Sequence, residues 1–123
     1  MPRATLCDTT SPYSCSFDST GVSDGLYDFR AISADNATNS TTSATVTNRR
    51  VDNTAPTAGL TDPGTPLRGT VTVDATGTDG GSGVANVAIQ RSPAGAGTWT
   101  TICTDTSSPY SCSWNTAGVS DGL

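Results

Sequence analysis

The chain contains one stretch of sequence twice, and this duplication restricts its fold more than any other feature. The stretch 9–26 returns as 106–123, with an offset of 97 residues and five mild substitutions. A length near 97 residues is typical of a small domain, so we expect the repeating unit to be a whole domain. The chain then holds the end of one unit and the beginning of the next, out of register with the domain boundary.

The composition predicts strands around a small core. Only 33% of the residues are hydrophobic and 6% aromatic, and Thr, Ser and Gly are abundant. Such a composition favours strands and turns over helices. All six basic residues are Arg and all eleven acidic residues are Asp, which gives a net charge of −5. A nucleic acid or an anionic membrane would require a basic surface, so neither is an expected partner. No segment is long and apolar enough to span a membrane.

The four cysteines form two pairs that the repeat relates to each other. Three pairings are open in principle, and the repeat favours the local ones, because each unit then closes its own bridge. We therefore expect the disulfides Cys7–Cys15 and Cys103–Cys112, each between the facing strands of a hairpin. The second copy has one extra residue between its cysteines, which we expect in the turn. The spacing and the absence of His argue against zinc, and disulfides indicate an oxidising compartment.

Alternating apolar and polar residues predict most of the strands. A hairpin is expected over residues 1–26, with strands at Thr5–Asp8 and Tyr13–Asp18. Further strands are expected over residues 26–35, 42–48, 57–60, 69–76, 84–91, 98–104 and 110–115. Seven short strands in about 97 residues, separated by turns, predict an all-β fold, the seven-stranded immunoglobulin-like β-sandwich. Residues 1–50 would hold the last four strands of one unit, 51–56 a polar linker, and 57–123 the first five strands of the next.

Three motifs carry a resemblance to a known family. They are Asp52-Asn53-Thr54-Ala55-Pro56-Thr57, Gly80-Gly81-Ser82-Gly83-Val84 and Asp24-Gly25-Leu26-Tyr27-Asp28-Phe29-Arg30-Ala31. Together they resemble the bacterial immunoglobulin-like (Big-type) repeats, which occur in tandem in secreted and surface proteins. The resemblance covers nearly the whole chain. It implies a spacer or adhesive role and an extracellular or cell-surface location.

Four aromatic residues are expected in the core. Phe17 and Trp114 occupy equivalent positions of the two copies, which indicates that the fold requires an aromatic side chain there. Tyr27 and Phe29 share one face of the strand predicted over 26–35. Tyr27 also resembles the tyrosine corner of immunoglobulin-like sandwiches.

We expect no catalytic site, because a chain without His, Lys or Glu lacks the ordinary bases for a nucleophile. No cofactor is required, and Ca²⁺ is the one ion that the side chains would suit. Five candidate ligands belong to segments that meet at one end of an immunoglobulin-like sandwich: Asp35, Asn36, Asp52, Asn53 and Asp79. The alternative is that each forms or caps a turn.

The function that we expect is structural, as a repeat module of an extracellular filament, stalk or adhesin. Its partners would be copies of itself or neighbouring immunoglobulin-like repeats. The incomplete units could close by folding back as a circularly permuted domain, by head-to-tail complementation between molecules, or within a longer continuous array. The alternative function is an accessory module that binds a polysaccharide or another cell-surface ligand, which would require exposed aromatic residues.

Overall fold

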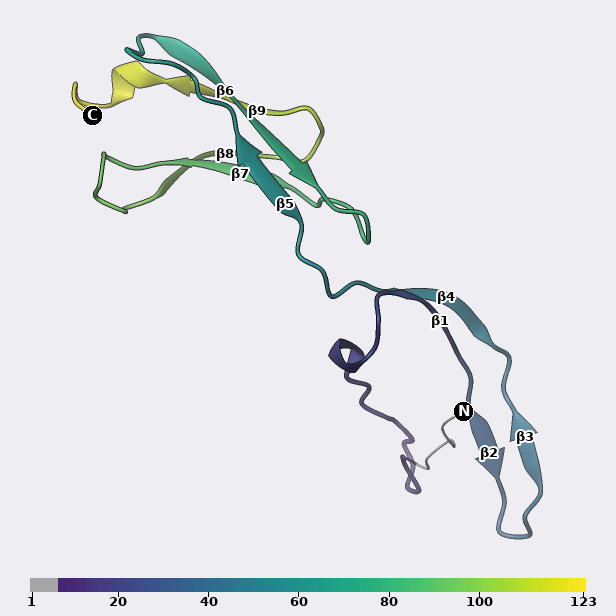
Figure 1. Ribbon diagram of the computed structural model, residues 1–123. Coiled ribbons are helices and arrows are strands. Elements are labelled where there is room, and N and C mark those ends of the chain that lie inside the picture. The colour runs from purple at the N-terminus through teal and green to yellow at the C-terminus, as the bar shows by residue number, and fades with distance from the viewer. Residues whose placement is uncertain (1–6) are drawn as a thin grey trace. The chain divides into compact units, whose positions relative to one another are not determined.

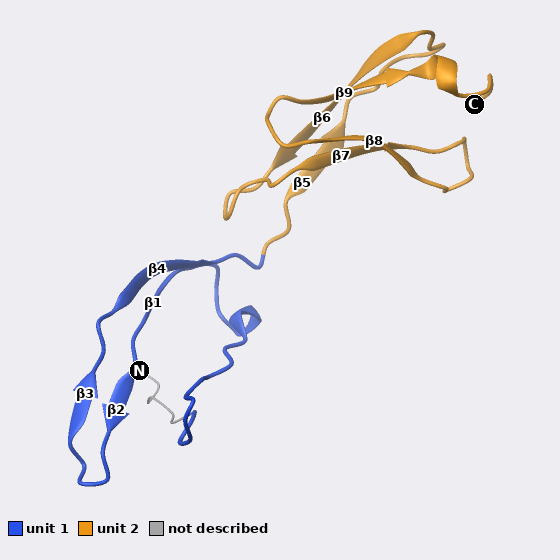
Figure 2. Ribbon diagram, turned by 180° about the vertical axis from the view of Figure 1, so that it is seen from behind, with its two compact units in different colours: residues 1–53 blue, residues 54–123 orange. Residues whose placement is uncertain are grey.

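The computed structural model describes residues 7–123, which form antiparallel strands and two short 3-10 turns (Figure 1). The chain divides into two compact units, residues 1–53 and 54–123 (Figure 2). The division lies inside the polar segment 51–56 that we expected as a linker. Each unit is described separately below.

Unit 2 contains two sheets that pack against each other. The first has the strand order β5-β6-β9, and the second pairs β7 with β8. All pairs are antiparallel. The bounds are β5 Thr57–Leu60, β6 Thr70–Thr78, β7 Val87–Arg91, β8 Thr100–Asp105 and β9 Tyr110–Asn115, followed by the turn η2 at Thr116–Gly118.

The core of unit 2 lies between these sheets and follows from the alternation in the sequence. Every second residue of β6 points inward, and Val73 and Ala75 are buried there. They pack with Ile89 of β7 and with Tyr110 and Cys112 of β9. Few large side chains take part, as the low hydrophobic content predicts.

The described part of unit 1 is a long, irregular β-hairpin preceded by residues 7–24, which contain no strand. The hairpin consists of β1 (Gly25–Phe29), β2 (Ile32–Ala34), β3 (Ser40–Thr42) and β4 (Val46–Val51). β1 pairs with β4 and β2 with β3. The β1–β4 pairing contains one extra residue on β4, between the pairs Tyr27–Arg49 and Phe29–Val46, whereas the β2–β3 pairing is regular.

Two strand predictions for the hairpin were too simple. The strand expected over 26–35 is divided into β1 and β2, because the backbone N–H of Ala31 donates to Ser43 Oγ instead of to a strand. The strand expected over 42–48 is divided likewise into β3 and β4. Among the described residues, neither unit contains all seven expected strands, and the nine observed strands are shared between the two.

The described residues 7–26 do not form the hairpin that we expected over residues 1–26. Residues 8–18 contain no strand, and Thr5 and Leu6 lie outside the described residues. The equivalent strand of unit 2, β9, is held by its ladder with β6. The described part of unit 1 contains no equivalent of β6, and a strand without a partner leaves its backbone hydrogen bonds to water.

The disulfide Cys103–Cys112 forms as expected, but the two cysteines do not lie on paired strands of one hairpin. Cys103 is on β8 and Cys112 on β9, but β8 pairs with β7 and β9 with β6. The disulfide therefore joins the two sheets instead of the two strands of one hairpin.

The duplicated turns have the same conformation in both units. Asp18 caps η1 (Ser19–Gly21) with φ −84° and ψ 101°, and Asn115 caps η2 with φ −86° and ψ 102°. Each cap side chain accepts a hydrogen bond from the backbone N–H two residues later.

Candidate functional site

One side of unit 2 is open, and this side is the candidate site. On the closed side the disulfide Cys103–Cys112 joins β8 to β9, with 5.8 Å between the two Cα atoms. On the other side the outer edges of β5 and β7 pair with no further strand in the described residues. Between these edges lies a groove of about 310 Å³, lined by residues 58–60 of β5, Ala75 of β6 and residues 87–90 of β7. We call it the acceptor groove.

The acceptor groove leaves part of the apolar core uncovered. Leu60 is 62% exposed at the end of β5. Ile89 is buried by its own unit, yet its neighbour Ala88 is exposed along the free edge of β7. An open sheet edge beside apolar side chains is a site where another strand can add.

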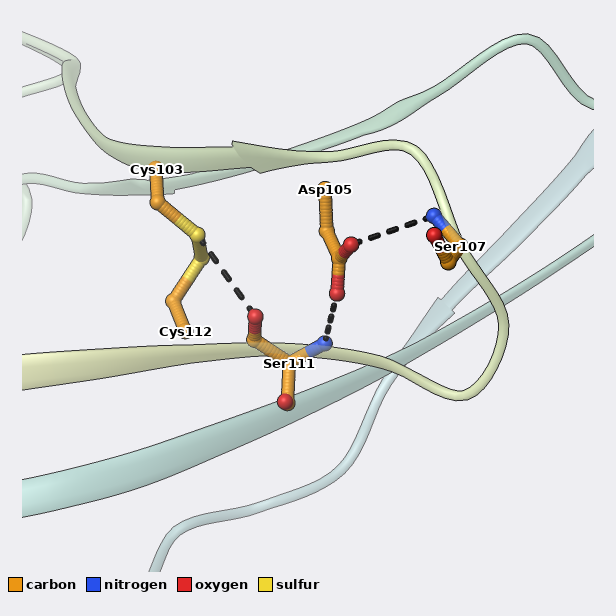
Figure 3. Close-up of a disulfide and its surroundings, with 5 residues drawn as sticks. All are labelled: Cys103, Asp105, Ser107, Ser111 and Cys112. Carbon is orange, nitrogen blue, oxygen red and sulfur yellow. Dashed lines mark hydrogen bonds between the residues drawn. A yellow bond between two sulfur atoms is a disulfide. The ribbon is translucent and has the colours of Figure 1, made fainter.

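The closed side is held by local hydrogen bonds in addition to the disulfide (Figure 3). The carboxylate of Asp105 accepts hydrogen bonds from the backbone N–H groups of Ser107, at 3.1 Å, and Ser111, at 3.0 Å. These bonds hold the pKa of Asp105 below its usual value of 3.8, and the bond from Ser111 has the largest effect. The short loop after β8 is therefore fixed by a charged side chain.

The first copy repeats this arrangement. Cys7 is bonded to Cys15, and Asp8 accepts hydrogen bonds from the backbone N–H groups of Thr10 and Ser14. The two bonds lower the pKa of Asp8, and the bond from Thr10 has the largest effect. Since the Asp-capped turns match, the extra residue of the second copy lies between Cys103 and Asp105, in β8. We had expected this residue in the turn, and that expectation was wrong.

The hairpin of unit 1 carries large apolar side chains that are exposed to solvent. Four large side chains there are between 43% and 54% exposed: Leu26, Phe29, Ile32 and Val46. Phe29 contacts Phe17 edge to face, with ring centroids 5.9 Å apart. Phe17 is itself 52% exposed, so the two phenylalanines that we expected in a core contact each other without being buried. The reason is that the described part of unit 1 lacks the strands that would cover them.

The other two expected core aromatics are half-buried. The hydroxyl of Tyr27 donates to the carbonyl oxygen of Ser23 at 2.7 Å, which is the local contact of a tyrosine corner. Trp114 packs under the guanidinium of Arg91, whose central carbon lies 5.8 Å from the ring centroid. Such a contact is a cation–π interaction.

The structure gives most of the candidate calcium ligands local roles. Asp35 accepts hydrogen bonds from Ala37 and Asn39 and closes the loop between β2 and β3. Asn53 donates its side-chain N–H groups to the carbonyl oxygens of Ser19 and Val22. Asp79 accepts from Gly81 in the loop after β6.

The hairpin also separates two of the candidate pairs. Asn36 follows Asp35 in the exposed loop at one end of the hairpin, and Asp52 precedes Asn53 at the other end, directly after β4. Within residues 7–123, no group of three or more acidic or cysteine side chains is placed to hold a metal ion. The same residues include no helix with the length and hydropathy needed to cross a membrane.

The residues of the acceptor groove were not among those predicted from the sequence. Leu60 and Ala88 looked like ordinary strand residues, because the pattern does not show which strand edge is left open. One available signal was the offset of the repeat. It aligns Leu123 with Leu26 of β1, so the rest of β1 is the segment that follows this position in the repeat.

Comparison with known proteins identifies the family to which unit 2 is similar. A family model described as a bacterial Ig domain matches residues 50–123. Neither the curated proteins nor the solved structures include a match.

Proposed function

Since the chain belongs to the bacterial Ig domain family, we propose that it is a non-catalytic structural module of an extracellular filament, stalk or adhesin. In this proposal its incomplete units complete one another head to tail. The hairpin of unit 1, residues 25–51, is the donor, and the acceptor groove of unit 2 receives it. We call residues 25–51 the donor hairpin.

One observation carries the proposal: each chain presents both an unfilled groove and an exposed apolar hairpin. Leu60 is 62% exposed beside the free edges of β5 and β7. Ile32 is 54% and Phe29 43% exposed on the donor hairpin. Because the two surfaces are different, their contact is heterologous and can add further molecules without closing. Such a contact suits a linear array.

The composition and the disulfides support an extracellular location. Two disulfides in a chain with so small a core are typical of proteins from oxidising compartments. Eleven Asp against six Arg keep the surface acidic, which favours solubility over binding to nucleic acid. We propose that the module requires no cofactor.

The mass of the protein in solution tests head-to-tail assembly. We expect light scattering after size-exclusion chromatography to give multiples of 12.4 kDa that grow with concentration, and electron microscopy to show linear particles. Leu60→Asp should shift the population to monomers, because a charge in the filled groove costs about 2–3 kcal/mol of association free energy. Thr61→Asp, next to it and outside the groove lining, is the matched control. A wild-type protein that stays monomeric up to its solubility limit would refute the assembly.

A second candidate function rests on a different observation. Trp99 is 65% and Tyr13 71% exposed, and exposed aromatic rings can stack on sugars. This favours an accessory module that binds a polysaccharide or a cell-surface glycan. Affinity electrophoresis in gels that contain polysaccharides tests it, with Trp99→Ala as the variant. Retardation of the wild type that Trp99→Ala abolishes would support this alternative.

A further inference from the structure

We propose that Asn53 is a positioning residue that fastens the end of unit 1 and so limits how freely the chain moves between the two units. Its side chain and its backbone both bind to residues 18–24, the segment that contains the turn η1. We call these contacts the Asn53 clasp. The inference goes beyond head-to-tail assembly and does not rest on it, because all of these contacts lie within unit 1.

The Asn53 clasp consists of side-chain and backbone hydrogen bonds. The side-chain amide nitrogen of Asn53 donates to the carbonyl oxygens of Ser19, at 2.9 Å, and Val22, at 3.2 Å. An asparagine side chain carries two N–H donors, so it can satisfy both carbonyl oxygens at once. The backbone N–H of Asn53 donates to Asp24 Oδ1 at 2.7 Å. This bond ends on a carboxylate, and such charge-assisted bonds are stronger than those between neutral groups.

The turn that receives Asn53 has its shape without the clasp. The caps of η1 and of its equivalent η2 have nearly equal φ and ψ angles. Among the described residues, no asparagine side chain donates to the carbonyl oxygens of Thr116 and Val119, which are the equivalents of Ser19 and Val22. The acceptors are therefore in position before Asn53 binds. Binding to acceptors that are already ordered loses little conformational entropy, which favours the clasp.

The clasp fastens the second strand of the hairpin to the segment that already holds the first. The hydroxyl of Tyr27, on β1, donates to the carbonyl oxygen of Ser23. Asn53 follows β4 and binds to the residues on either side of Ser23. Val51, the last residue of β4, is the one buried residue in the described part of unit 1. The chain thus stays attached to unit 1 beyond the end of its last strand.

The clasp shortens the linker between the units. Residues 52–56 connect β4 to β5. With Asn53 bound to the turn, at most residues 54–56 remain between the fastened end of unit 1 and the first strand of unit 2. Pro56 has a fixed φ angle, and it restricts the residue before it to extended conformations. Few backbone torsions are then left about which one unit can rotate relative to the other.

The clasp residue lies at the start of the matched domain. The match to the bacterial Ig domain begins at residue 50, whereas the structural division falls after residue 53. Asn53 thus belongs to the matched domain by sequence and to the preceding unit by its contacts. In this inference the first residues of the domain fasten it to the unit before it. Such a junction suits a spacer, because successive units then keep a limited range of orientations.

Hydrogen exchange measured by NMR tests whether the clasp persists in solution. Asn53→Asp keeps the shape of the side chain but removes both donors and adds a charge that the carboxylate of Asp24 repels. We expect the backbone N–H at this position to exchange at least about tenfold faster in the variant than in the wild type. Asn39→Asp is the matched control, since Asn39 donates to Asp35 in the loop between β2 and β3. It should leave exchange at Asn53 unchanged.

Backbone ¹⁵N relaxation tests whether the clasp limits movement between the units. It is measured in the Leu60→Asp background, so that the assembly proposed above does not contribute. With Asn53 present, the rotational correlation times of the two units should be nearly equal. With Asn53→Asp they should separate and become shorter, while Asn39→Asp should leave them as they are. If Asn53→Asp unfolds unit 1, Asp24→Asn provides a milder change in the same direction, because it weakens the charge-assisted bond.

The outcomes distinguish a persistent clasp from its effect on the junction. Exchange at Asn53 that is as fast as at Asn36, in an exposed loop, would overturn the clasp itself. Slow exchange that Asn53→Asp abolishes, together with unchanged relaxation, would overturn the limit on movement and leave a contact that only stabilises unit 1. Neither result bears on head-to-tail assembly, which is judged by the mass of the protein in solution.

Discussion

Cys103 of β8 and Cys112 of β9 are bonded across two different sheets, with their Cα atoms 5.8 Å apart. The acceptor groove lies on the opposite side of unit 2, between β5 and β7. The covalent bond therefore holds the sandwich together on the side where no strand has to be added.

Removal of this disulfide should destabilise unit 2. The bond joins residues separated by nine positions, and a loop of this size contributes about 2.5 kcal/mol by its effect on unfolded-chain entropy. We expect the double variant Cys103→Ala, Cys112→Ala to lose about that much free energy of unfolding. Urea denaturation followed by tryptophan fluorescence measures it, because both Trp99 and Trp114 belong to unit 2.

The first disulfide provides the control for that experiment. Cys7→Ala with Cys15→Ala changes unit 1 alone, so the tryptophan transition should keep its midpoint. An equal loss from both double variants would show that the two units unfold as one, which contradicts the expected independence.

The Asp-capped turns predict a loss of stability in acid. Backbone hydrogen bonds lower the pKa of Asp8 and Asp105 from 3.8, so folding favours their charged forms. A lowered pKa in the folded state contributes stability above pH 3.8, which is lost as the pH falls through the folded value. We expect stability from these groups to be constant between about pH 5 and 7 and to decrease below about pH 4.

Carbon-detected NMR titration of the Asp carboxyl groups checks this directly. Asp105 should titrate below 3.8, and Asp105→Asn should make the acid-induced decrease in melting temperature smaller. Asp62→Asn, in the loop after β5, is the control. A normal pKa for Asp105 would mean that its hydrogen bonds do not persist in solution.

A valine at position 77 should separate β6 from β7. A Cβ added to Gly77 would lie 3.2 Å from Val87 Cγ2 and 3.5 Å from the carbonyl oxygen of Thr57. We expect Gly77→Val to cost about 1–3 kcal/mol of unfolding free energy through overpacking. Gly80→Ala is the control, since no atom lies within 4 Å of its added Cβ. Urea unfolding compares them, and equal stability of the two variants would contradict the close packing at Gly77.

Calcium should leave the isolated chain unchanged. Asp35 and Asp79 already accept backbone hydrogen bonds in separate loops, and Asp35 lies at the other end of the hairpin from Asp52. Calorimetric titration with CaCl₂ should give no binding heat and no change in melting temperature. Binding heat that Asp79→Asn removes would instead support a calcium site.

The sequence was sufficient to place most strands but not to pair them. β5 and β9 have the predicted bounds, and β6, β7 and β8 begin or end within three residues of prediction. Alternation shows which residues face inward, because that property depends on one strand alone. It does not show the neighbour of a strand, so β8 was assigned to β9 when it pairs with β7.

The candidate site was harder to predict for a related reason. Leu60 and Ala88 line a groove only because no strand covers β5 and β7 in the described chain. Phe17 and Phe29 are exposed for the same reason. Their residue types are those of a core, and the sequence alone assigns them to one. The repeat offset aligns Leu123 of unit 2 with Leu26 of unit 1. It is therefore the sequence feature that relates the groove of unit 2 to the hairpin of unit 1.

The matching turns η1 and η2 bear on the order in which such a chain folds. Both have the same cap geometry, although only η2 follows a strand that belongs to a sheet. Their shape thus depends on contacts within a few residues, and contacts so close in sequence form quickly because little chain entropy is lost. The chain reversal that leads toward the next hairpin can be in place early. Docking of that hairpin requires contacts between residues that are distant in sequence or that belong to different molecules. We therefore expect it to be the slow step in completing each unit.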